Sequence, residues 1–360
     1  NREKKGKYFI SASASDHRGK IVFFNPQNEE MTLLPMFNNA VQGDLISLEL
    51  GGVIAEEVKK MLMGEGNLLD RHYDYNNTSF ERFHYESDIQ INDGKDPFKD
   101  KKILLVGAGA LGCFIGPATI NNIQPGELDI MDFDVVEAHN LNRQVCHYNA
   151  VGKLKAESLA SVLTKMSRGK TKIRSIVDKF TEDTEFAGGY DLIFDAVDSF
   201  YAKSLLHNYC LRNNVPLISG GTDFRAGTVI SYVRGKTSCL NCQIDLNALA
   251  LKAEIIRRTS CLQSPDPSVI MTNQITGAIM VSEGRCVLRS DLYGEPINGE
   301  IKFISDFESR GGVSRKNSIC DCHERGLQKL ELPSPERVKV EERDVNGRKI
   351  TEVFLDGKKL

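Results

Sequence analysis

The chain has 360 residues, of which 41% are hydrophobic and 26% are charged, and its formal net charge is -3. This length and composition allow one large domain and a small one, and the weak net charge argues against nucleic acid or a membrane surface as a partner. The sequence has neither an apolar run of 18 residues, as a membrane span needs, nor an apolar signal region near its start. Nine cysteines without a secretion signal favour reduced thiols and a metal site over disulfides, so we expect a cytoplasmic protein.

Residues 1–75 combine short β-like runs with one helical pattern. The runs are 7–11, 20–24 and 31–34, and apolar residues then recur every three or four positions over 47–63. Three strands and a helix in this space predict a small winged-helix-like module, and a plain dimerisation or packing appendage is the alternative. Residues 76–100 are polar and irregular, and we interpret them as a connector.

A glycine-rich loop follows the first long apolar run. Residues 102–106 are typical of a buried parallel strand, and Gly107, Gly109 and Gly112 then form a G-x-G-x-x-G pattern that opens the next helix. In this pattern the second glycine lets a phosphate approach the backbone, and the free N–H groups at the helix start favour an anion. The sequence therefore predicts a phosphate-binding loop.

Two classes of enzyme use such a loop. A nicotinamide or flavin enzyme needs an acid about 20 residues further on to hold a ribose, and Asp132 satisfies that need. An adenylating enzyme also needs cations for a triphosphate, and Arg143 and Lys155 supply them around the polar run 140–144. A dinucleotide site has little use for two extra cations, so we favour ATP as the nucleotide.

From residue 101 onward, predicted strands and helices alternate, which is typical of a parallel sheet with helices on both faces. Ligands of such sheets bind beyond the carboxyl ends of the strands. Asp198 follows the run 191–195 and is therefore placed to hold Mg²⁺, whereas we expect Asp195 to be structural. The predicted helices are 110–122, 152–167 and 201–213, and the predicted strands are 102–107, 128–133, 173–178, 191–195, 216–219 and 227–234.

Two cysteine pairs far apart in the chain predict a zinc site. Cys239 and Cys242 form C-x-x-C, and Cys320 and Cys322 form C-x-C, followed by His323. Thiolates at these spacings favour a tetrahedral structural zinc with Cys322 or His323 as the fourth ligand, and free thiols are the alternative. In the last segment, 331–360, two β-like runs flank Asn346-Gly347, which is a hairpin signal.

Several of these motifs together carry a resemblance to a known family. They resemble the E1-like (ThiF/MoeB) adenylating superfamily over about residues 78–325, and they are Gly107–Gly112, Asp132–Asp134, Asn140–Gln144 and Lys155. The resemblance implies an α/β, Rossmann-like adenylation domain with a parallel-rich sheet over 101–330. It also implies the use of ATP and Mg²⁺, and a homodimer in which each chain completes the partner's ATP site.

The resemblance further implies roles for single residues. Asp132 would hold the ribose, Arg143 and Lys155 the phosphates, and Asp198 the Mg²⁺ ion. In the family, an arginine preceding the loop reaches the partner's ATP site; here Phe80 takes the expected position and Arg82 follows, so a plain surface arginine is the alternative. Cys261 lies where some E1 proteins carry a thioester cysteine, although no base or cation adjoins it in the sequence. The pocket would be lined by Gly107, Gly109, Gly112, Asp134, Asn140 and Gln144.

The substrate is also suggested by resemblance. Residues 1–75 resemble the peptide clamp of enzymes that modify ribosomally made peptides, and stretches 76–87 and 235–243 resemble peptide-modifying members such as the microcin-C enzyme MccB and the pantocin enzyme PaaA. The implied function is ATP-dependent activation of a carboxylate on a precursor peptide, leading to modification or cyclisation, with the leader held by residues 1–75. The alternative is adenylation of a ubiquitin-like sulfur-carrier protein, and a nicotinamide-dependent oxidoreductase is the least favoured.

Overall fold

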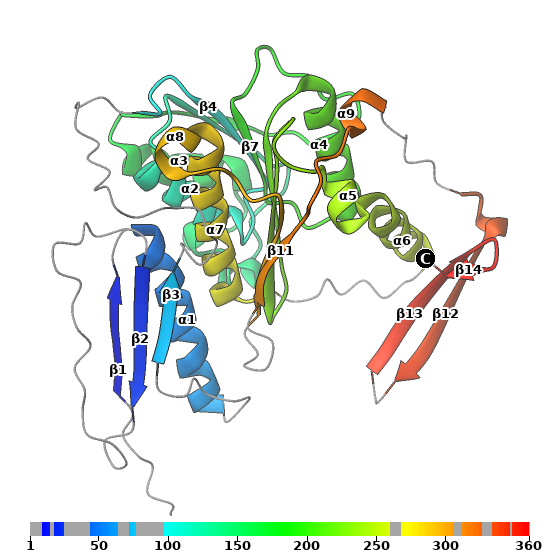
Figure 1. The fold of residues 1–360 in the computed structure, drawn as a ribbon, viewed down its shortest axis with the longest axis horizontal. Coiled ribbons are helices and arrows are strands. Elements are labelled where there is room, and N and C mark those ends of the chain that lie inside the picture. The colour runs from blue at the N-terminus through cyan, green and yellow to red at the C-terminus, as the bar shows by residue number, and fades with distance from the viewer. Residues whose placement is uncertain are drawn as a thin grey trace, which may run out of the picture.

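The fold is described from a computed structural model, which covers residues 9–14, 18–24, 44–63, 72–76, 97–259, 268–304, 311–325, 333–345 and 348–359. These residues form one large sheet and two three-stranded sheets (Figure 1). Within the same ranges, every helix is too short or too polar to cross a membrane.

The central sheet has eight strands in the order β11-β10-β9-β8-β7-β4-β5-β6. Strands β6, β5, β4, β7 and β8 are parallel, while β9, β10 and β11 continue the sheet in antiparallel pairing. The predicted α/β class with a parallel-rich sheet is therefore confirmed. The bounds are β4 Lys102–Val106, β5 Glu127–Met131, β6 Lys172–Ile176, β7 Leu192–Asp195, β8 Leu217–Thr222, β9 Ala226–Tyr232, β10 Gly299–Ile304 and β11 Gly311–Arg315.

Helices cover both faces of this sheet (Figure 1). On one face, α7 packs against α2 and strands β8 and β9, and α3 packs against α2 and β6; on the other face, α4 packs against α6 and β8. The bounds are α2 Gly112–Asn122, α3 Lys155–Ser167, α4 Phe200–Asn213, α5 Leu240–Ile244, α6 Leu246–Thr259, α7 Ile270–Leu288, α8 Ser290–Tyr293 and α9 Cys322–Arg325, with 3-10 helices η2 Ala138–Asn142, η3 Val145–His147 and η4 Pro335–Arg337.

Strand β4 shows why the apolar run 102–106 becomes the centre of the molecule. Successive side chains of a strand point to opposite faces, and here Ile103 and Leu105 enter the core beneath α2 and α7 while Leu104 and Val106 enter the core beneath α4. All four side chains are buried. A continuous apolar run therefore suits this position, where an alternating one would leave polar groups buried on one face.

The amino-terminal module is a three-stranded antiparallel sheet with one helix. Its elements are β1 Phe9–Ala14, β2 Arg18–Phe24, α1 Asp44–Met63 and β3 His72–Asn76. The described sheet takes its third strand from 72–76, in order β1-β2-β3, immediately before the connector 76–100 that the sequence predicts to be irregular. That run is short and polar, so its pairing with β2 decides its conformation. The run 31–34 lies outside the described residues.

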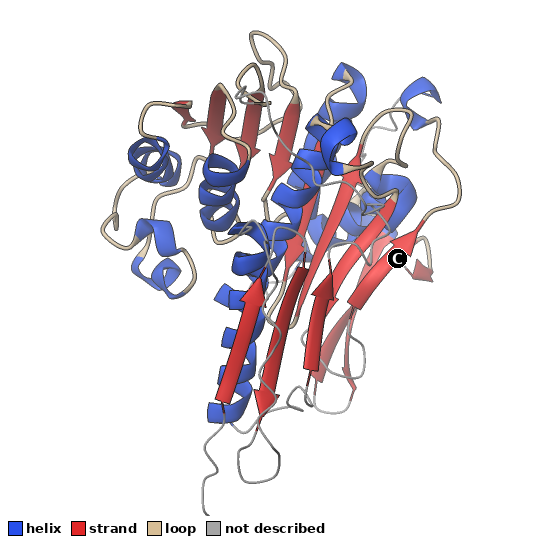
Figure 2. Cartoon of the chain, turned by 60° about the vertical axis from the view of Figure 1, so that its left-hand side comes forward, coloured by secondary structure: helices blue, strands red, loops and turns tan. Residues whose placement is uncertain are grey.

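Helix α1 joins the module to the rest of the chain. It contacts β1 and β2 and also packs against α7. A long helix lies beside the strands of the module in Figure 2. The Nε2 of Gln274, on α7, donates to the carbonyl of Leu48, on α1, at 2.7 Å. The module is thus fastened to a helix that itself covers the central sheet.

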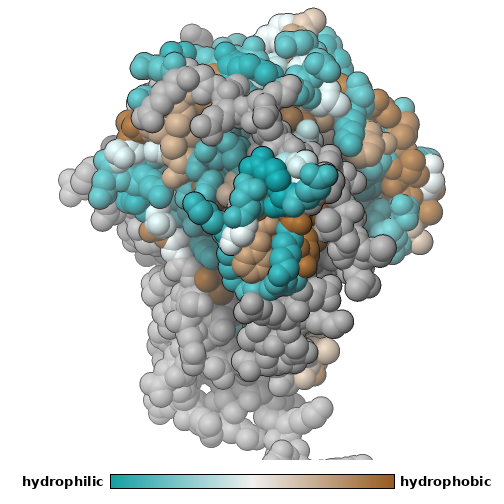
Figure 3. Space-filling model, turned by 90° about the vertical axis from the view of Figure 1, so that its right-hand side faces the viewer, coloured by the Kyte–Doolittle hydropathy of each residue, from teal (hydrophilic) through white to brown (hydrophobic). Residues whose placement is uncertain are grey.

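The carboxyl-terminal residues form a separate small sheet. Strands β12 Val338–Val345 and β13 Arg348–Leu355 pair antiparallel across positions 346–347, and β14 Lys358–Lys359 pairs with β13. This sheet packs on α6, and the side chain of Val353 is fully buried there. On this side of the molecule, patches of hydrophobic residues lie among hydrophilic ones (Figure 3).

Candidate active site

The glycine-rich loop connects β4 to α2. Gly107 has φ +100°, and a Cβ placed there would lie 2.7 Å from the carbonyl oxygen of Ala196, so both its conformation and its space require glycine. A Cβ on Gly112 would lie 2.2 Å from the carbonyl oxygen of Gly107. At Gly109 the nearest atom would be Gln144 Nε2 at 3.7 Å, an ordinary contact. The fold itself therefore leaves Gly109 room for a side chain, and a bare backbone there suits the close approach of a ligand.

Asp132 joins the loop to the end of β5. Its Oδ2 accepts a hydrogen bond from the Ala108 N–H at 2.7 Å, and its Oδ1 accepts one from the Asp134 N–H at 2.8 Å. Burial raises the pKa of the Asp132 carboxyl, and these two backbone hydrogen bonds oppose that rise. The carboxylate therefore lies at the loop, where the sequence predicts a ribose ligand.

Lys155 begins α3 beside the same loop. Its Nζ donates to Asp134 Oδ2 at 2.8 Å, and the lysine side chain is 10% exposed while that of Asp134 is 48% exposed. An ammonium group has three donors, so this ion pair holds Lys155 in place and leaves donors for a phosphate.

The polar run 140–144 covers the end of η2 and the two residues that precede η3. The Asn140 side chain is buried and accepts from the Glu137 N–H at 3.0 Å, which closes η2 in a capping box. Gln144 is also buried, and within the described ranges its Oε1 has no hydrogen-bond partner. Arg143 is partly exposed and donates to Asn142 Oδ1 at 2.9 Å. Gln144 therefore lies against the glycine-rich loop, whereas the Asn140 side chain is engaged in capping η2.

The two acids at the end of β7 have different surroundings. Asp195 is fully buried and accepts from Lys203 Nζ at 3.1 Å and from Ser219 Oγ at 2.6 Å. It also accepts from the Val197 N–H at 3.1 Å and so shapes the turn that leads to Asp198. Asp198 itself is exposed at the carboxyl end of the strand, which fits an oxygen ligand for Mg²⁺.

Sequence reasoning missed two residues of this region. Lys203 is the partner of Asp195, and the only sequence signal is a lysine placed five residues after Asp198, on the following helix. His147 contacts the glycine-rich loop from a position 39 residues beyond it. Two candidates, Arg82 and Cys261, lie outside the described residues, and so does the side chain of His323.

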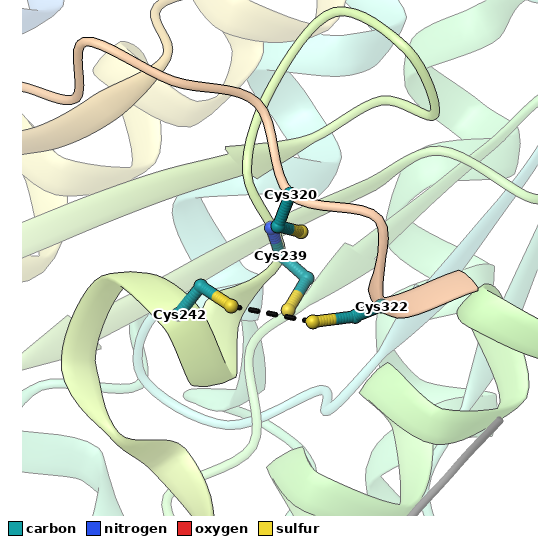
Figure 4. A group of neighbouring side chains, drawn as sticks. All are labelled: Cys239, Cys242, Cys320 and Cys322. Carbon is teal, nitrogen blue, oxygen red and sulfur yellow. Dashed lines mark hydrogen bonds between the residues drawn. The ribbon is translucent and has the colours of Figure 1, made fainter. Parts of the chain in front are cut away.

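The four predicted cysteines come together (Figure 4). The Sγ atoms of Cys239, Cys242, Cys320 and Cys322 all lie within 4.8 Å of one another, and those of Cys242 and Cys322 are 3.3 Å apart. Zn–S bonds of about 2.3 Å in a tetrahedron would place sulfurs about 3.8 Å apart. The donor set thus fits zinc, with four thiols from the described residues and no need of His323.

The two cysteine segments are also held together by other groups. Ser238 Oγ donates to the carbonyl of Ser318 at 2.7 Å, and the Ser238 N–H donates to Asn298 Oδ1 at 2.7 Å. Asn298 Nδ2 in turn donates to the carbonyls of Lys316 and Ser318. The thiols are therefore gathered by the surrounding protein, as expected of a site that fastens loops.

Comparison with known proteins places the chain among adenylating enzymes. The ThiF family model matches residues 85–315. Molybdopterin-synthase adenylyltransferase of Escherichia coli K12 is 31% identical over 217 residues, which are 58% of this chain and 80% of that protein. SAMP-activating enzyme E1 of Haloferax volcanii is 27% identical over 255 residues, which are 66% of this chain and 86% of that protein.

Solved structures of E. coli MccB share the fold. MccB with succinimide has a TM-score of 0.52 and 24% identity over 61% of this chain and 64% of that chain. MccB with AMPCPP and SeMeT MccA has a TM-score of 0.53 and 18% identity over 86% of this chain and 96% of that chain.

Proposed function

The chain belongs to the ThiF family as an E1-like, ATP-dependent adenylating enzyme, and from this premise we propose that it activates a carboxylate of a ribosomally synthesised precursor peptide. Activation leads to modification or cyclisation of that peptide. The observation that carries the proposal is the module of β1, β2, β3 and α1, which is fastened to the adenylation domain through α7.

The comparisons support a peptide in two ways. The superposition with the MccB structure that contains MccA extends over 86% of this chain. A second MccB structure contains MccA-N7isoASN. By analogy, a peptide is the substrate of this chain, and residues 1–75 form the part that recognises its leader.

The geometry of the module suits an extended peptide. In the order β1-β2-β3, the outer strands each pair on one side only among the described strands. An exposed strand edge can accept an extended peptide as a further strand, with main-chain hydrogen bonds supplying affinity. A leader bound there would keep the reacting carboxylate at high effective concentration near the nucleotide.

The residues of the site have proposed roles in the chemistry. A carboxylate oxygen of the peptide attacks the α-phosphorus of ATP, and the bond from this phosphorus to the oxygen that bridges to the β-phosphate breaks. Pyrophosphate departs, and the product is an acyl-adenylate. Asp132 holds the ribose, and Arg143 and Lys155 offset the phosphate charge. Asp198 is the proposed ligand of Mg²⁺, which when bound supplies further charge neutralisation. The pocket is lined by Gly107, Gly109, Gly112, Asp134, Asn140 and Gln144.

The zinc and dimer assignments complete the proposal. Zinc held by the four cysteines would be structural, because all four ligand positions are taken by protein.

A homodimer is supported by large apolar side chains exposed beside the nucleotide motifs, namely Phe133 at 53%, Tyr148 at 73% and Val151 at 54%. A second copy would cover them and bring its Arg82 to the neighbouring site.

One alternative has its own supporting observation. The molybdopterin-synthase adenylyltransferase matches over 80% of its own length, which favours a ubiquitin-like sulfur-carrier protein as the substrate. In that case the amino-terminal module would serve packing alone.

ATP–pyrophosphate exchange separates these substrates. The acceptors to compare are a precursor peptide with its leader, the same peptide without it, and a sulfur-carrier protein. We expect the leader-bearing peptide to stimulate exchange at the lowest concentration, and loss of the leader to raise that concentration about tenfold or more. Exchange stimulated only by the carrier protein would contradict the peptide proposal and support the alternative.

A further inference from the structure

His147 lies where the nucleotide motifs meet. Its side chain is fully buried at the end of η3, directly after the polar run 140–144. Its Nε2 lies 2.7 Å from the carbonyl oxygen of Ala108, in the glycine-rich loop, and its Nδ1 lies 2.9 Å from Ser158 Oγ, on α3. Ser158 follows Lys155 by about one helical turn. One imidazole therefore connects the loop, the polar run and the helix of the candidate phosphate cation.

These contacts determine the position of the proton on the ring. A carbonyl oxygen can only accept, so Nε2 must carry the hydrogen and donate it to Ala108. In the neutral ring Nδ1 is then the acceptor, and Ser158 Oγ donates to it. Burial lowers the pKa of His147, which favours this neutral form.

The bond to Ala108 also orients the next group in the chain. The Ala108 carbonyl and the Gly109 N–H belong to one planar trans peptide unit, so they point in opposite directions. With the carbonyl held inward by His147, the Gly109 N–H is aimed away from the protein interior. Within residues 97–259 and 268–304 this N–H has no acceptor. The preceding peptide unit is fixed as well, because the Ala108 N–H donates to Asp132.

We propose that His147 is a positioning residue for ATP, holding the Ala108 carbonyl so that the Gly109 N–H faces the phosphates. Ser158 supports it by donating to Nδ1, which the bond to Ala108 leaves as an acceptor. The inference rests on the nucleotide role of the loop and is independent of which peptide or protein carries the carboxylate.

Binding of a non-hydrolysable ATP analogue to the full chain, measured by calorimetry without peptide, tests the proposal. His147→Leu removes the donor and leaves a buried carbonyl without a partner, and we expect Kd to rise on the order of tenfold. His147→Gln can place an amide N–H near the position of Nε2 and should stay within about threefold of the parent. In turnover, His147→Leu should raise the KM for ATP more than it lowers kcat at saturating ATP.

The chain provides a matched control in a second buried histidine. His207 is 1% exposed, and within the described ranges neither of its ring nitrogens has a hydrogen-bond partner. His207→Leu should leave Kd for the analogue within about twofold. Equal losses in His147→Leu and His207→Leu would overturn the positioning role, and so would a His147→Gln variant as impaired as His147→Leu. A parent protein that binds no ATP analogue would instead contradict the adenylating function.

A measurement on the unmodified protein covers the case in which His147→Leu fails to fold. Nitrogen-15 NMR of the labelled imidazoles should show a neutral ring with a protonated Nε2 for His147, assigned with the folded His147→Gln or Ser158→Ala variant. In Ser158→Ala, Nδ1 loses its donor while the bond from Nε2 to Ala108 remains, and we expect a loss in ATP affinity smaller than that of His147→Leu. A resonance from the Nδ1–H tautomer in the parent would overturn the proposal.

Discussion

The contact between α1 and α7 can be tested with two neighbouring glycines. A Cβ on Gly52 would lie 2.5 Å from Ile275 Cγ1 and 3.2 Å from the carbonyl oxygen of Met271, so part of the obstacle is backbone. A Cβ on Gly51 would meet only Gln274 Nε2, at 2.9 Å, which is the far end of a flexible side chain. Both glycines lie inside α1, so the gain in helix propensity on substitution by alanine is the same.

The expected stabilities follow from these distances. Alanine in place of glycine inside a helix stabilises by about 1 kcal/mol, and overpacking against a buried side chain and backbone costs about 1–3 kcal/mol. Because a 2.5 Å approach to Ile275 places the cost in the upper half of that range, Gly52→Ala should lower the free energy of unfolding by about 1–2 kcal/mol. Gly51→Ala must move Gln274, whose bond to Leu48 is worth about 1 kcal/mol, and so should change stability by less than about 0.5 kcal/mol.

Urea unfolding of both variants measures these changes, and leader-peptide binding measures their effect on the proposed function. Since Gly52→Ala pushes the module away from α7, we expect leader-dependent exchange to weaken while affinity for the ATP analogue stays the same. Equal stability of the two variants would refute the close packing of α1 on α7. Unchanged exchange in a destabilised Gly52→Ala protein would refute the link between the docking of the module and its role.

Further predictions concern metals, assembly and pH. Asp198→Ala should lower turnover on the order of 100-fold with the fold intact, whereas activity within threefold of the parent would show that another group holds Mg²⁺. Elemental analysis should find about one zinc per chain, and its loss in Cys242→Ser would assign the site. Light scattering should give a dimer at micromolar concentration, and a monomer would end the proposed role of Arg82. Burial lowers the pKa of His207 to about 4 in the folded chain, whereas its pKa in the unfolded chain is about 6.5. As pH drops from about 6.5 to about 4, the unfolded chain binds a proton that the folded chain does not, so the free energy of unfolding should fall by about 3 kcal/mol. His207→Leu should lack this loss in acid titrations.

The central sheet could be predicted because its strands are specified locally. The run 102–106 is apolar throughout since both its faces are buried, and the glycines after it satisfy a conformation and a close contact that only glycine allows. The parallel strands and helices α2, α3 and α4 follow the same local rules. The sequence does not predict β10 and β11, because these strands mix glycine with polar residues and gain their stability from antiparallel pairing of β10 with β9 and of β11 with β10.

The sequence predicts only those residues of the candidate site that belong to short motifs of consecutive or closely spaced residues. The sequence predicts Asp132, Lys155 and the four cysteines from their motifs, and the structure brings Asp132 to the glycine-rich loop, Lys155 to Asp134 and the cysteines to one cluster. The partners of His147 and Asp195 lie on other elements, namely the loop at Ala108 and the helix that carries Lys203. No pattern in one segment reveals such a bond, since it depends on how the two elements pack against each other.

Helix α7 gives the physical reason why a module at one end of the chain can serve a site in the middle. It contacts α1 at the glycine pair already described, and a Cβ on its Gly277 would lie 2.9 Å from Phe114 Cβ on α2, the helix that follows the glycine-rich loop. A Cβ on its Gly284 would lie 2.7 Å from the ring of Phe194, on the strand that ends at Asp195. A helix packed this closely on three sides has no space to shift. The position of α1 relative to the nucleotide loop is therefore set by direct contacts, and a leader held by the module would place its peptide at a defined distance from the adenylating residues.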